Sequence, residues 1–107
     1  MTQPLLTHSS AAVAALFLGD PRAELYGLEI VEGACSTKGT IYPMLISWEE
    51  RGWLQSRWET DEELSARSRE EPGSRRRYYT LTKRGLAQLT EYLGRWEARQ
   101  KGRRAAI

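Results

Sequence analysis

The chain has 107 residues, of which 40% are hydrophobic and 28% are charged, a balance that is typical of one folded domain and excludes extensive disorder. Its single cysteine excludes an internal disulfide bond, and its apolar runs are too short to span a bilayer, so we expect a cytoplasmic protein without a membrane partner. The net charge of +2 is small, but basic residues gather between Gly73 and Arg84, which suits a polyanionic partner.

Two helices are predicted in the first third of the chain. The first covers the apolar run from Ala11 to Leu18, which the sequence Gly-Asp-Pro ends. The second covers residues 24 to 33, where apolar residues recur at helical spacing. A tight turn follows, in which Gly33 is expected to adopt a left-handed conformation and Ser36 to cap the next helix.

A third helix is predicted from about Thr37 to Arg51, ended by Gly52. Two helices joined by a short turn, with a third before them, are the outline of a helix-turn-helix unit. The third helix would face the core with one apolar stripe, formed by Ile41, Leu45 and Trp48.

The second half of the chain predicts two strands and a last helix. The strands cover residues 53–58 and 75–81, and a long polar insert between them is expected to be a mobile wing. Thr82 is expected to cap the last helix. The predicted fold is therefore mainly α with a small β-hairpin, a winged helix-turn-helix followed by a C-terminal helix. Residues 1–82 would form the DNA-binding part, and residues 83–107 a dimerisation helix with a basic tail, all in one compact domain.

Several strings along the chain, taken in order, resemble the PadR-like family of winged helix-turn-helix transcriptional regulators. They are Gly39-Thr-Ile-Tyr-Pro-Met-Leu45, Trp48-Glu-Glu-Arg-Gly-Trp-Leu-Gln-Ser56 and Arg76-Arg-Tyr-Tyr-Thr-Leu-Thr-Lys-Arg-Gly85. The single C-terminal helix is similar to the short subclass of that family. The resemblance implies a homodimer, joined through this helix, that represses transcription from a palindromic operator in double-stranded DNA. The third helix would lie in the major groove and the wing against the DNA backbone.

The candidate DNA-binding residues lie at the start of the third helix and in the wing. Side chains near the N-terminal end of such a helix read bases, while exposed amides and cations there attract phosphate. The alternatives are that Tyr42 packs against an earlier helix and that the basic residues are solvated surface charges. The candidates are Ser36, Thr37, Lys38, Gly39, Thr40, Tyr42, Arg75, Arg76, Arg77 and Lys83.

An apolar stripe on the last helix is the candidate dimer interface, because it is large for one small domain to cover. The family resemblance also implies that a small aromatic effector could bind near Trp96, although aromatic stripes more often serve packing. The interface candidates are Leu86, Leu89, Tyr92, Leu93 and Trp96.

Catalytic and metal-binding chemistry have little support in the sequence. His8 has no metal-ligand partners at a suitable spacing, so neither a metal nor a cofactor is expected, and Cys35 is expected to be a small packing residue or, if exposed, a redox sensor. The main hypothesis is thus a DNA-binding regulator that is not an enzyme. The alternative is a winged-helix module that binds another protein and has lost DNA binding.

Overall fold

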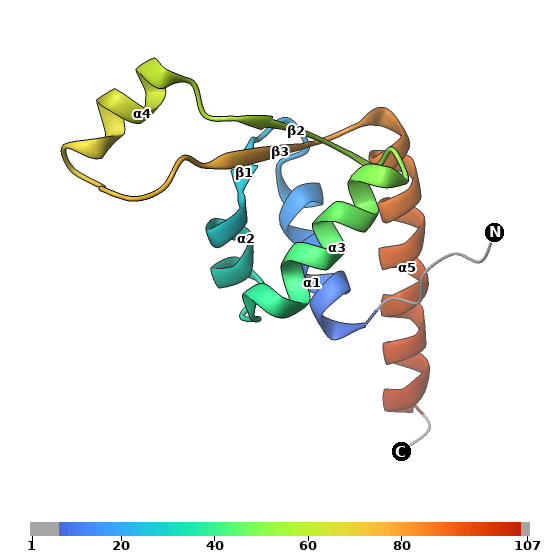
Figure 1. Ribbon diagram of the computed structural model, residues 1–107. Helices are drawn as coiled ribbons and strands as arrows, with labels where there is room; N and C mark the ends of the chain where they lie inside the picture. The colour runs from blue at the N-terminus through green and yellow to red at the C-terminus, as the bar shows by residue number, and fades with distance from the viewer. Residues whose placement is uncertain (1–6, 106–107) are drawn as a thin grey trace.

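The computed structural model describes the backbone of residues 7–105 and the side chains of residues 7–102. That part of the chain forms five helices and a three-stranded sheet (Figure 1), which confirms the predicted winged helix-turn-helix class. The elements are α1 (His8–Gly19), β1 (Leu25–Tyr26), α2 (Gly27–Gly33), α3 (Lys38–Glu50), β2 (Leu54–Trp58), α4 (Asp61–Ser68), β3 (Arg77–Leu81) and α5 (Lys83–Ala105).

The sheet contains one strand more than the predicted hairpin. Its order is β1-β3-β2, and both pairings are antiparallel. The prediction of helix from residue 24 was wrong for Leu25 and Tyr26, which are extended and pair with Tyr79 and Tyr78. The rings of Tyr26 and Tyr78 also meet edge to face, with centroids 6.0 Å apart. Cross-strand contacts of this kind outweigh the helical spacing of so short a segment.

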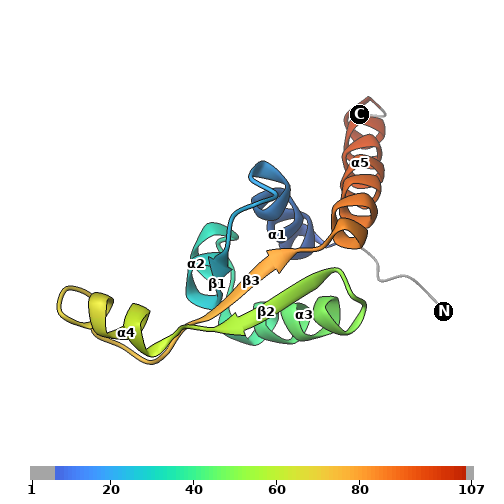
Figure 2. The same ribbon diagram turned by 90° about the horizontal axis from the view of Figure 1, so that it is seen from above.

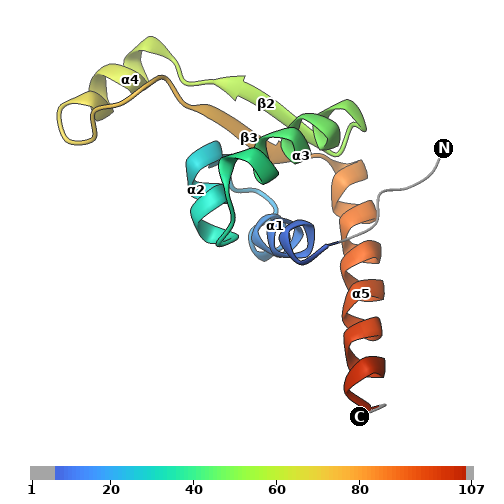
Figure 3. The same cartoon turned by 60° about the horizontal axis from the view of Figure 1, so that its bottom comes forward.

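The core lies where α1, α2, α3 and the start of α5 meet the sheet (Figure 3). The predicted stripe on α3 is confirmed, because its three residues are all buried. Burying such side chains is the main favourable contribution to folding. The core consists of Val13, Ala14, Phe17, Ile30, Val31, Ile41, Leu45, Trp48, Trp53, Leu54, Tyr79, Leu89 and Tyr92.

The turn between α2 and α3 differs from the prediction in two residues. Cys35, and not Gly33, has the left-handed backbone, with φ of 51°, and its amide donates to the carbonyl of Glu32. Gly33 still belongs to α2, so the left-handed position falls two residues later, just after the helix C-cap. The cap of α3 is Thr37 instead of Ser36, since the Thr37 hydroxyl accepts a hydrogen bond from the amide of Thr40.

A close backbone contact joins the end of α3 to the start of α5 (Figure 2). Gly52 ends α3 with φ of 77°, as its position after the helix predicted. Thr82 caps α5, because its hydroxyl accepts from the amide of Gly85 at 2.9 Å and donates to the carbonyl of Gly52 at 2.6 Å. A β-carbon on Gly85 would lie 2.0 Å from the carbonyl oxygen of Trp53, so only glycine fits there.

The insert between β2 and β3 is not the irregular loop that its polar composition predicted, because part of it is helical. It contains α4, whose N-terminus has a capping box formed by Thr60 and Glu63. No residue of α4 is buried, and the helix stands away from the core at the tip of the hairpin (Figure 1). The wing of this chain is therefore a long β-arm that carries a helix.

The last helix, α5, runs on through the basic tail as far as Ala105. Leu89 and Tyr92 are buried within the chain, where α5 packs beside α1, so the expectation that a partner would cover these two residues was wrong. Leu86 is 41% exposed, and Leu93 and Trp96 are half-buried. The C-terminal half of α5 extends beyond the body of the molecule (Figure 1). The side chains of residues 103 and 104, part of the predicted basic tail, lie outside the described ones.

Candidate nucleic-acid interface

The start of α3 presents most of the residues predicted to read DNA. Thr37, Lys38, Gly39 and Thr40 are exposed, and their helix end carries the free amides that attract anions. Ser36 is only half exposed, and its hydroxyl lies 3.3 Å from the hydroxyl of Ser9 on α1, so it also links α3 to α1.

Tyr42 lies one turn further along α3, where its position is compatible with both predicted roles, packing against an earlier helix and contact with DNA. Its ring rests against the start of α2, where a β-carbon on Gly27 would come within 3.0 Å of it. The side chain nevertheless remains 38% exposed. A phenol in this position is held by packing and still has a surface for a partner.

The wing arginines Arg75 and Arg76 precede β3 and are each engaged by a carboxylate of the wing. Arg75 lies 2.7 Å from Asp61 and also donates to the carbonyl of Glu59 at 2.6 Å. Arg76 lies 2.8 Å from Glu71, and its guanidinium stacks 3.9 Å from the centre of the Tyr26 ring. Neither residue is simply a solvated charge.

Arg77 is the first residue of β3 and faces α3. Its guanidinium stacks on the ring of Trp58, 4.9 Å from the centroid, and lies 3.8 Å from the carboxylate of Glu49. Trp58 is 56% exposed, which is unusual for so large an apolar side chain. Arginine and tryptophan together form a flat, cationic surface between α3 and the wing.

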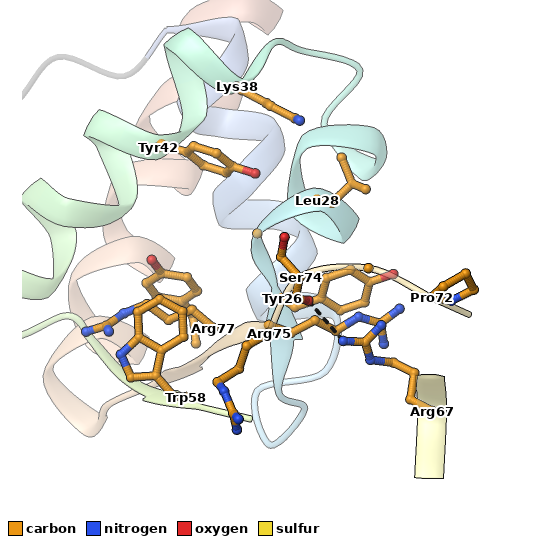
Figure 4. Close-up of a pocket in the computed structure, with 14 residues that line it drawn as sticks. Tyr26, Leu28, Lys38, Tyr42, Trp58, Arg67, Pro72, Ser74, Arg75 and Arg77 are labelled. Carbon is orange, nitrogen blue, oxygen red and sulfur yellow. Dashed lines mark hydrogen bonds between the residues drawn. The ribbon is translucent and has the colours of Figure 1, made fainter. Parts of the chain in front are cut away.

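A groove of about 480 Å³ separates α3 from the wing and brings several of the predicted residues together (Figure 4). Lys38 and Tyr42 lie on its α3 side, and Arg75 and Arg77 on its wing side. Lys83 does not line it, because it lies at the start of α5, at the other end of the hairpin. The complete lining is Tyr26, Gly27, Leu28, Lys38, Tyr42, Trp58, Arg67, Pro72, Gly73, Ser74, Arg75, Arg76, Arg77 and Tyr79.

Comparison with known proteins identifies the family to which this fold and groove belong. The sequence profile of the transcriptional regulator PadR-like family matches residues 21–91, from the loop before β1 to the middle of α5. The chain belongs to the PadR-like family. No similar protein was found among curated proteins.

Solved structures share the fold of this PadR-like protein at low sequence identity. A PadR family transcriptional regulator from Eggerthella lenta is 24% identical, with a TM-score of 0.63, over 88% of this chain and 80% of that one. A PadR-like regulator from Bacillus cereus is 20% identical, with a TM-score of 0.65, over 90% and 87%. MepR from Staphylococcus aureus in its DNA-binding conformation is 11% identical, with a TM-score of 0.64, over 95% and 66%.

A buried ion pair, which the sequence did not predict, organises the wing of this PadR-like regulator. Both carboxylate oxygens of Glu59 accept from Arg67, at 2.7 and 2.8 Å, and the Glu59 side chain is only 1% exposed. Arg67 also donates to the carbonyls of Glu71 and Ser74, which closes the loop after α4. The Arg67 guanidinium holds the pKa of Glu59 at about 2. The alternation of residues along a strand could not reveal this ion pair, because Glu59 and Arg67 lie eight residues apart in the chain.

A second arginine connects the wing to the strand at the other edge of the sheet. Arg57 on β2 donates to Glu24 at 2.7 and 2.9 Å and to Glu63 at 2.8 and 3.1 Å. It also stacks over Tyr78, 4.9 Å from the ring centre. Hydrogen bonds from Arg57 and the Thr60 amide hold the pKa of Glu63 at about 2. The direction of the wing is thus fixed at its base by one guanidinium and two carboxylates.

The remaining candidates of the sequence lie apart from the groove. Cys35 is exposed in the α2–α3 turn. The ring of His8 meets that of Trp96 edge to face at 5.4 Å. Within residues 7–105, no group of three or more His, Cys, Asp or Glu side chains could hold a metal ion, and no helix is long and apolar enough to cross a membrane.

Proposed function

We propose that this PadR-like protein is a sequence-specific, double-stranded DNA-binding repressor that acts as a homodimer in the cytoplasm. The observation that carries the proposal is the groove, in which Lys38 and Tyr42 of α3 face the arginines of the wing. A helix in the major groove, with arginines of the wing beside it, can contact bases and the adjacent phosphates together. Membership of a family of transcriptional regulators supports this proposal.

The start of α3 and the wing would contribute differently to binding. Lys38 and the free amides at the start of α3 suit phosphate or the acceptor edge of guanine, and Thr40 suits several base edges. Tyr42 would donate its hydroxyl to a phosphate while its ring stays packed on α2. Affinity would come mainly from the cations, and sequence preference from the start of α3.

Fluorescence anisotropy with mixed-sequence duplexes at several salt concentrations tests this proposal. Lys38→Ala should weaken binding and reduce the salt slope by about one unit, because one phosphate contact is lost. Lys101→Ala is the matched control, since this exposed lysine lies near the far end of α5. Equal binding by both variants, or no duplex binding at low salt, would contradict the proposal. Selection of duplexes from a random pool should then return a palindrome.

A second candidate function is a protein-binding module without DNA binding. The observation that favours it is that carboxylates of the same chain already engage the wing arginines, while Ile46 on α3 and Trp58 on β2 are 57% and 56% exposed. Trp58 lines the groove, and tryptophan is enriched at protein interfaces relative to the rest of the surface. Copurification of a stoichiometric protein partner, together with no duplex binding at low salt, would select this candidate.

The homodimer would form through the exposed side of α5. Leu86 and Leu93 are seven residues apart, so they lie on one face, next to the face that packs on α1. Leu86→Lys should lower the molar mass in multi-angle light scattering from dimer to monomer. Leu28→Lys is the control, because Leu28 on α2 is 42% exposed and Leu86 is 41% exposed. A dimer that survives Leu86→Lys would place the interface elsewhere.

An effector that releases the protein from DNA would need an aromatic surface, and Trp96 is the candidate on α5. This side chain is half-buried, and His8 covers part of its ring. A planar aromatic dye that binds there should quench the fluorescence of Trp96 and weaken duplex binding. Both effects should disappear in Trp96→Leu, and their persistence would remove Trp96 from the proposal.

A further inference from the structure

The groove arginines Arg75 and Arg76 have carboxylate partners that are exposed to solvent, unlike the buried Glu59 of the same wing. Arg75 lies 2.7 Å from Asp61, at the first position of α4, and Arg76 lies 2.8 Å from Glu71, in the loop after that helix. The Asp61 side chain is 92% exposed and that of Glu71 is 67% exposed. These two carboxylates contribute nothing to the core, and yet they occupy the cations that face the groove.

A carboxylate and a phosphate diester compete for the same guanidinium, because both offer oxygen acceptors to its N–H groups. The Arg75–Asp61 pair is exposed and therefore weak, so a phosphate can displace its carboxylate. In the Arg76–Glu71 pair only the carboxylate is exposed, while Arg76 is held by the Tyr26 ring, so a phosphate can replace Glu71 without moving the arginine. Glu59 is different, because it is buried against Arg67 and supports the wing itself. Only the pairs with an exposed carboxylate can open without unfolding the wing.

We propose that Asp61 and Glu71 are built-in competitors of DNA phosphate that occupy Arg75 and Arg76 and so reduce both the affinity for DNA and its salt dependence. The inference rests on the proposed DNA-binding function. In the free protein the two carboxylates hold the arginines in position at the edge of the groove. DNA must exchange each carboxylate for a phosphate, so part of the attraction between the wing and DNA is already cancelled within the chain.

Two neighbouring residues provide matched controls. Glu62 follows Asp61 in the first turn of α4, and Glu70 precedes Glu71 in the loop, and both are exposed. Within the described part of the chain, neither forms an ion pair with an arginine. The double variants Asp61→Asn/Glu71→Gln and Glu62→Gln/Glu70→Gln therefore remove the same charge from the same wing, but only the first releases arginines.

The experiment measures the affinity of each variant for a 30-base-pair mixed-sequence duplex by anisotropy over a series of salt concentrations. The Asp61→Asn/Glu71→Gln variant should bind about 2- to 30-fold more tightly than the unmodified protein, as expected when two ion pairs with exposed carboxylates no longer compete. Its salt slope should steepen by about 0.9 for each new phosphate contact. The Glu62→Gln/Glu70→Gln variant should show a smaller gain and an unchanged slope.

An equal gain and an equal slope in both double variants would overturn the inference, because charge alone would then explain the effect. No gain in Asp61→Asn/Glu71→Gln would overturn it as well. The single variants Asp61→Asn and Glu62→Gln repeat the comparison at two exposed side chains outside the core. They test the inference even if a double variant fails to fold. If the unmodified protein binds no duplex at the lowest salt, the proposed function itself fails, which is a distinct result.

Discussion

The contact between Gly85 and Trp53 predicts that one added methyl group at the start of α5 destabilises the whole fold. In an open helix position, replacing glycine by alanine stabilises a protein by about 1 kcal/mol. At Gly85 the new β-carbon would lie 2.0 Å from the Trp53 carbonyl oxygen and 2.8 Å from its carbon. Backbone atoms cannot rotate away as a flexible side chain can, so we expect the upper end of the overpacking cost, about 3 kcal/mol or more.

The net loss for Gly85→Ala is therefore about 2 kcal/mol, which lowers the Tm of a domain of this size by about 8–16 °C. Thermal unfolding followed by circular dichroism, at one protomer concentration, measures it. Gly94→Ala is the control within the same helix, because its β-carbon would meet nothing within 4 Å, and it should raise the Tm by about 4–8 °C. The reasoning is refuted if Gly85→Ala is as stable as Gly94→Ala.

Three further predictions concern the wing, the core and a turn. Glu59 has a pKa of about 2 in the folded chain and of 4.5 ordinarily, so its pairing stabilises the fold above pH 4.5 and the stabilisation is lost as the pH falls toward 2. The difference in unfolding free energy between the unmodified protein and Glu59→Gln should therefore shrink over that pH range. Leu45→Ala should cost about 2–5 kcal/mol in urea unfolding, because Leu45 is fully buried, whereas Ile46→Ala next to it should stay within about 0.5 kcal/mol. Cys35→Gly should raise the Tm, since it relieves about 1 kcal/mol of left-handed backbone strain, and an unchanged Tm would contradict that account.

Periodicity predicted the helices of the core well, because burial and sequence pattern agree there. The stripe of α3, its end at Gly52 and the cap of α5 at Thr82 all lie where the residue types indicated. Leu25 and Tyr26 were misassigned because a two-residue strand has no period of its own, and only its partners on β3 define it. The helix in the wing did have a local sequence signal, the capping box of Thr60 and Glu63, but the polar composition of the insert favoured a loop.

The candidate site was predicted in its residues more than in its interactions. Lys38, Tyr42 and the arginines of the wing do line one groove. Their partners could not be foreseen, because Asp61 and Glu71 reach the arginines through the fold of the arm and not through a regular spacing. The burial of Leu89 and Tyr92 had a similar cause, since α1 covers the face of α5 that was expected to await a second copy.

The rigid joint between α3 and α5 has a geometric consequence for a dimer built on α5. Because Thr82 hydrogen-bonds the carbonyl of Gly52 and Gly85 touches the Trp53 backbone, the two helices meet at a fixed angle. In such a dimer, any change in the crossing angle of the paired α5 helices would move each α3 together with its α5. The distance between the two α3 helices, which must match the helical repeat of DNA, would then be set far from the DNA itself.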